Sequence, residues 1–141
     1  MIGILILGHK QFAEGLLHAV EHTFGSRPPA MATAGIDYAE STEKFADLIR
    51  RRIAGVDEGD GVVILADIFG TTHTNVACRF VEPGRVELIS GANLPMVLRT
   101  LTYRDLPLDE LVNRALTGGF NGIICAPQAA KESRPPRERG P

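Results

Sequence analysis

A histidine and an aspartate each follow directly on a run of apolar residues. His9 comes after "IGILIL" and Gly8, and Asp67 closes the run "VVILAD". A neutral imidazole is a nucleophile near neutral pH. A neighbouring carboxylate can accept one ring N–H, which fixes the tautomer and leaves the other nitrogen free. The pair predicts a phosphoimidazole on His9 with Asp67 as the orienting acid. The residues alone also fit a second interpretation, in which the histidine only makes a local hydrogen bond at a helix start.

Two further stretches add polar groups near the predicted strand ends. The loop "DIFGTTHTN" supplies glycine, hydroxyls, an imidazole and an amide, and "SGANLPM" follows a later strand. Both stretches also suit plain helix caps and turns. The residues that we predict to bind phosphate or a partner protein are Lys10, Gly70, Thr71, Thr72, His73, Asn75 and Asn93.

The elements that position these residues alternate along the chain. Continuous apolar runs are typical of strands that are buried on both faces of a parallel sheet, and spacing of three and four residues indicates helices. Strands are predicted at 2–7, 29–36, 62–67, 85–90 and 121–126, and helices at 10–24, 43–53, after 70, after 91 and at 108–116, where Gly118 and Gly119 end the last one.

This alternation predicts an α/β fold with a doubly wound, mostly parallel sheet. With the strand order 2-1-3-4, the first and third strands are neighbours, and the winding reverses between them. Ligands of such sheets bind outside the carboxyl ends of the strands at that reversal. His9 and Asp67 should therefore face the same crevice.

Other chemistries find little support. His18 and His22 share one helix face, as zinc ligands can, but no HExxH motif accompanies them, so we expect a solvated face and no metal. Cys78 and Cys125 lack a CxxC spacing and are expected to be buried in a protein of a reducing compartment. Dinucleotide, P-loop and nucleophile-elbow motifs are absent from the sequence, so no cofactor is expected.

Composition sets the remaining limits. The chain has 141 residues and a formal net charge of −2, which favours neither nucleic acid nor an anionic membrane. No apolar stretch reaches the ~20 residues of a membrane span, and the start of the chain does not resemble a signal peptide, so a cytoplasmic protein is expected. We expect one domain at 1–126 and a disordered polar tail at 127–141.

Over residues 1–126 the sequence resembles the mannose-type IIA component of the bacterial phosphoenolpyruvate:sugar phosphotransferase system. The resemblance rests on the order and spacing of "GH" at 8–9, "ADIFGTTHTNVA" at 66–77 and "ISGANLPM" at 89–96. It implies that His9 takes phosphate through Nε2 from the small carrier protein HPr and passes it to a IIB component. It also implies that Asp67 is the orienting carboxylate. The implied fold is a four-stranded parallel sheet whose fifth, antiparallel strand, here 121–126, is exchanged in a homodimer.

The chain departs from the family at two places. Lys10 stands where a small residue is common, and His73 stands where proline is common. The resemblance implies a phosphotransferase component that acts in sugar uptake or its regulation. It would have a separate IIB acceptor and could associate with a membrane permease complex without itself spanning the membrane. The alternative is a non-catalytic, flavodoxin-like module that binds a small anion in the same crevice.

Overall fold

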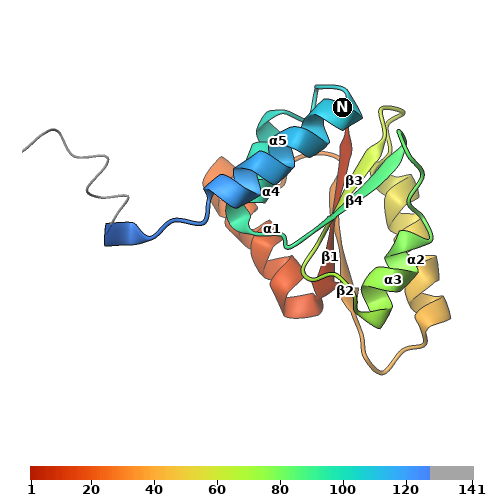
Figure 1. Ribbon diagram of the computed structural model, residues 1–141. Coiled ribbons are helices and arrows are strands. Elements are labelled where there is room, and N and C mark those ends of the chain that lie inside the picture. Colours follow the sequence, from red (N-terminus) through yellow and green to blue (C-terminus); the bar gives the residue numbers. More distant parts are fainter. Residues whose placement is uncertain (128–141) are drawn as a thin grey trace, which may run out of the picture.

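The computed structural model describes residues 1–127, so the tail predicted at 127–141 lies outside the described residues except for Pro127. Strands and helices alternate as far as the fourth strand, and two helices follow it (Figure 1). In chain order the elements are β1 (Gly3–His9), α1 (Lys10–Phe24), β2 (Met31–Ile36), α2 (Thr42–Val56), β3 (Val62–Ala66), α3 (Thr72–Cys78), β4 (Val86–Ser90), α4 (Leu94–Thr102) and α5 (Leu108–Asn121).

The four strands form one parallel sheet in the order β2-β1-β3-β4, which confirms the predicted order. The two central strands are β1 and β3, and their residues are buried apart from His9 at the end of β1. Such strands have helices on both faces, which explains why their sequences are apolar without alternation. The register pairs Leu7 with Ala66 and His9 with Ile36, so the ends of three strands meet at one edge of the sheet.

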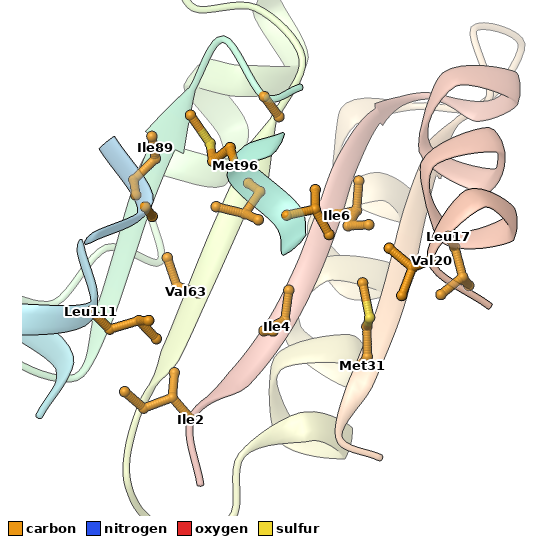
Figure 2. Close-up of a cluster of buried hydrophobic side chains, with 14 of the residues drawn as sticks. Ile2, Ile4, Ile6, Leu17, Val20, Met31, Val63, Ile89, Met96 and Leu111 are labelled. Atoms are coloured by element: carbon orange, nitrogen blue, oxygen red, sulfur yellow. The ribbon is translucent and has the colours of Figure 1, made fainter. Parts of the chain in front are cut away.

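Helices cover both faces of the sheet. The helices α1, α4 and α5 lie on one face, and α2 and α3 lie on the other (Figure 1). Successive residues of β1 alternate between the two cores: Ile4 and Ile6 pack with Leu17 and Met96, and Leu5 belongs to the opposite core. Figure 2 shows the first of these cores, in which side chains from α1, α4 and α5 meet the sheet. The helices packed on both faces hold the sheet, and with it the carboxyl ends of its strands, in place.

Helix α5 is longer than predicted. It runs through Gly118 and Gly119 to Asn121 instead of ending at the two glycines. A Cβ at Gly118 would overlap the side chain of Arg99, and one at Gly119 would overlap Met96. The glycines therefore serve close packing of α5 on α4 within a continuous helix, although the same residues usually mark a helix end.

The strand predicted at 121–126 does not form within this chain. Asn121 is the last residue of α5, and residues 123–125 are neither helix nor strand. An exchanged strand would pair with the sheet of a second chain. The structure holds a single chain, so the homodimer with an exchanged strand stays a prediction. Ile123 and Ile124 are 76% and 63% exposed.

The prediction that both cysteines are buried is wrong. Cys78 and Cys125 are exposed free thiols. Cys78 is the last residue of α3, and the core on that side is filled instead by Val76 and Ala77. Cys125 follows α5, beyond the packed part of the chain. Among residues 1–127 no helix combines the length and apolarity needed to cross a membrane.

Candidate functional site

His9 lies at the carboxyl end of β1 and is exposed. It is also the residue before the first turn of α1, with φ −48° and ψ 131°, and its side chain makes no capping hydrogen bond. No acidic residue occupies the first turn of α1. The free N–H groups and the positive end of the helix dipole therefore favour an anion next to His9.

Asp67 directly follows β3 and lies beside His9. Its Oδ2 accepts the backbone N–H of His9 at 3.0 Å, and its Oδ1 accepts the backbone N–H of Ile68 at 2.7 Å. A Cβ on Gly8 would overlap the Asp67 carboxyl group, so only glycine permits this approach. The contact that the structure shows is with the backbone of His9, and the ring contact expected from the sequence stays a prediction.

Lys10 is the first residue of α1 and is exposed. Its stem lies over Gly35, because a Cβ there would come within 2.9 Å of Lys10 Cγ. Lys10 therefore begins the helix beside His9 and crosses the end of the neighbouring strand β2. An ammonium group attached at this point adds positive charge to the anion-favouring end of α1.

The loop between β3 and α3 is shaped by threonine hydroxyls. Thr71 caps α3, since its Oγ1 accepts the backbone N–H of Thr74 at 3.1 Å. Thr74 Oγ1 donates in turn to the carbonyl of Ile68 at 2.6 Å. Thr71 thus has a structural role as a helix cap, which is the alternative that the sequence left open for this loop. Thr72 and Asn75 are exposed, and Gly70 turns the chain with φ +87°.

His73 belongs to α3 and not to the loop before it, and it is half-buried. Its ring meets Tyr38 edge-on at 5.3 Å between centroids and Phe45 edge-on at 5.1 Å. Tyr38 also lies 6.0 Å from the His9 ring. Neither aromatic neighbour was predicted from the sequence, although Tyr38 comes two residues after β2 and so lies at the same sheet edge as His9.

A cleft of about 480 Å³ opens at this edge. Its lining residues are Ile36, Tyr38, Asp67, Ile68, Gly70, Thr71, Thr72 and His73. His9 lies beside this cleft through its contact with Asp67 but does not line it, and neither do Lys10, Asn75 and Asn93. Asn93 instead caps α4: its Oδ1 accepts the N–H of Met96 at 2.9 Å, and its Nδ2 donates to the carbonyl of Gly119 at 3.0 Å. Asn93 therefore ties α4 to α5.

Comparison with protein families gives one assignment for this arrangement. The family model described as "PTS system fructose IIA component" matches residues 3–116, which include His9, Asp67 and the whole sheet. The chain belongs to this family of phosphotransferase-system IIA components. Members of this family are components of sugar phosphotransferase systems.

Individual relatives agree with the family assignment. The mannose-specific EIIAB component of Escherichia coli (strain K12) is 33% identical over 127 residues, which are 86% of this chain and 38% of that protein. This chain thus spans about two fifths of the length of that relative. The fructose-specific EIIA component of Bacillus subtilis (strain 168) is 30% identical over 115 residues, covering 80% of this chain and 78% of its own length.

Solved IIA structures share the fold. An EIIA component from Streptococcus agalactiae superposes with a TM-score of 0.80 at 22% identity, covering 91% of this chain and 99% of its own. The IIA protein associated with the fucose utilization operon of Streptococcus pneumoniae has a TM-score of 0.75 at 26% identity and covers 91% and 95%. The four-stranded parallel sheet is therefore the fold of this IIA family.

Proposed function

We propose that this IIA chain carries a phosphoryl group on His9, taken from phospho-HPr and given to a IIB-type acceptor. The observation that supports this most is the place of His9. It is exposed directly before the first turn of α1, beside the carboxylate of Asp67 at the point where the winding of the sheet reverses. A phosphoryl group on this ring would meet the anion-favouring helix end rather than a hydrophobic surface.

The transfer needs a neutral imidazole. In the proposed step, the lone pair of Nε2 attacks phosphorus, and the bond between phosphorus and the donor nitrogen breaks with its electron pair on the donor. The proton on Nδ1 stays, so the phosphorylated ring carries a positive charge until the group leaves. The second transfer runs in the same way with the IIB side chain as nucleophile.

Asp67 would stabilise that positive ring. Its two oxygens already bind the amides of His9 and Ile68, and each retains a lone pair that a nearby ring N–H can use. Thr72 and Asn75 offer exposed polar groups from α3, and Lys10 offers a cation from α1. These groups suit the oxygens of the phosphoryl group and the charged edge of a partner protein.

The experiment that tests this function incubates the protein with phosphoenolpyruvate, enzyme I and HPr and measures its intact mass. We expect a gain of one phosphoryl group that is labile in acid and stable in base, as a phosphoimidazole is. Addition of a IIB component should then remove it. Reversible phosphate binding without a covalent mass gain would instead favour the anion-binding module.

A further inference from the structure

No hydrogen bond in the described part of the chain orients the imidazole of His9. Among the hydrogen bonds formed within residues 1–127, His9 contributes its backbone N–H to Asp67, and none involves the ring. The ring has an aromatic neighbour instead. Tyr38 lies with its centroid 6.0 Å from that of His9 and with the two planes inclined at 47°. This separation is within the range in which aromatic rings attract one another.

The backbone that carries Tyr38 is fixed by a tight turn. Asp37 Oδ1 accepts the N–H of Ala39 at 2.9 Å, and the Asp37 carbonyl accepts the N–H of Glu40 at 3.1 Å. An aspartate that bonds the amide two residues later is a common way to stabilise a turn. Ser41 then caps α2 through the N–H of Lys44. Tyr38 is 68% exposed, but the hydrogen bonds of this turn hold its backbone.

Tyr38 also contacts a second ring, His73, which connects it to the core. His73 meets Tyr38 edge-on at 5.3 Å and 79°, and Phe45 meets His73 edge-on at 5.1 Å and 81°. Phe45 is 4% exposed and belongs to the core between α2 and the sheet. The four rings thus form a continuous row from the buried Phe45 to the exposed His9.

We infer that Tyr38 is a positioning residue for the reacting imidazole, and that His73 supports it. The inference rests on the proposed function, because it concerns how the phosphate-carrying ring is held. Contact with Tyr38 removes part of the rotational freedom of the His9 side chain before the donor arrives. Within residues 1–127 the Tyr38 hydroxyl makes no hydrogen bond to His9, so we assign this role to the aromatic ring and not to the hydroxyl.

The test compares Tyr38→Ala with Tyr38→Phe and His73→Ala with His73→Phe, using the full chain. Phe24→Ala is the matched control, since Phe24 is an aromatic residue, 53% exposed, at the other end of α1. Two quantities are measured for each variant: the NMR signals of the His9 ring carbons and nitrogens, and single-turnover transfer from phospho-HPr over a range of donor concentrations. Far-UV circular dichroism confirms that each variant is folded.

Tyr38→Ala should move the His9 ring signals and lower the maximum transfer rate by about threefold to tenfold, the factor that one aromatic pair supplies. The half-saturating donor concentration should change by less than about twofold, because positioning acts on the bound complex. Tyr38→Phe and Phe24→Ala should resemble the wild type. His73→Ala should act in the same direction as Tyr38→Ala but more weakly, and His73→Phe should restore the rate.

Unchanged His9 signals in Tyr38→Ala would overturn the inference, and so would a wild-type maximum rate in that variant. Loss of function in Tyr38→Phe equal to that in Tyr38→Ala would also overturn it, since the hydroxyl would then be the active group. If the wild type takes no phosphate at all, the proposed function fails. The ring signals would still decide whether Tyr38 orients His9.

Discussion

The Asp67 carboxylate holds the backbone of His9, with 3.0 Å between Asp67 Oδ2 and the His9 nitrogen. The other oxygen accepts the N–H of Ile68 at 2.7 Å. The bond to His9 joins the ends of the neighbouring strands β1 and β3, and the bond to Ile68 holds the carboxylate in place, so the start of α1 and the loop before α3 have a fixed relative position. The carboxylate therefore fixes the position of the His9 backbone, from which the imidazole extends. A contact between the carboxylate and the imidazole ring would be a second role of Asp67.

Replacing Asp67 by asparagine should slow transfer strongly. The amide keeps one acceptor oxygen and turns an N–H₂ group toward a backbone N–H, so one of the two bonds is lost, along with the charge that stabilises the positive ring. We expect the maximum single-turnover rate from phospho-HPr to fall on the order of 10²-fold. Asp47→Asn is the control, because that exposed carboxylate lies on α2, outside the cleft at the sheet edge, and pairs with Arg50. A wild-type rate in Asp67→Asn would refute its assigned part.

Replacing Gly8 by alanine should damage both stability and transfer. The new Cβ would overlap the Asp67 carboxyl group, and Gly8 has φ +154°. We expect the free energy of unfolding in urea to fall by about 2 kcal/mol or more. Gly15→Ala is the matched control on α1, where a Cβ meets nothing within 4 Å. That variant should gain about 0.5–1 kcal/mol, so equal effects of the two substitutions would contradict the close approach.

Arg104 should matter for stability and not for transfer. Its guanidinium is buried and donates to the carbonyls of Ile2, Pro29 and Ala30, and burial lowers the pKa of Arg104 below its ordinary value. Arg104→Met removes the guanidinium donors from all three carbonyls, and among residues 1–127 only the Ala30 carbonyl keeps a backbone donor, the N–H of Ile4 at 3.0 Å. The substitution should cost about 3 kcal/mol or more of unfolding free energy.

The control for Arg104 is Arg114→Met. Arg114 is exposed and lies over the Tyr103 ring at 4.6 Å. Its loss should change the unfolding free energy by less than about 1 kcal/mol. Folded Arg104→Met should take phosphate at the wild-type rate, because the arginine holds the opposite end of the strands. Equal stability of the two variants in urea would disprove the structural role.

The chain should form a homodimer through residues 121–126. Ile123 and Ile124 are exposed, and a pair of large apolar side chains after α5 favours burial against a second chain. Analytical ultracentrifugation at micromolar concentration should show a dimer for the wild type and a monomer for Ile123→Asp. Thr117→Asp, an exposed position on α5, should remain a dimer. A monomeric wild type, or a dimeric Ile123→Asp, would contradict the predicted interface.

The sequence predicted the sheet because its two central strands are apolar throughout. Runs such as "GILILG" and "VVILA" are buried from end to end, and this pattern requires helices on both faces. The same logic placed His9 and Asp67 at one edge, where the structure has them. The end of α5 could not be read in this way. Gly118 has the residue type of a helix terminus, and only its contact with Arg99 shows that it serves packing inside the helix.

The details of the site depended on contacts that sequence spacing does not record. The bond from Asp67 to the backbone of His9 requires Gly8 to lack a side chain, which became visible only in three dimensions. Tyr38 lies in a turn after the second strand, and its contact with His73 joins that turn to helix α3. Periodicity finds elements, but it does not find which side chains of different elements touch.

The most direct test of the account is the intact mass of the wild type and His9→Ala after incubation with phosphoenolpyruvate, enzyme I and HPr. The exposed His9 side chain makes no capping bond, so His9→Ala should fold normally. The wild type should gain one acid-labile phosphoryl group, and His9→Ala should gain none. Equal phosphorylation of both proteins, or of neither, would contradict the assignment of His9 as the phosphate carrier.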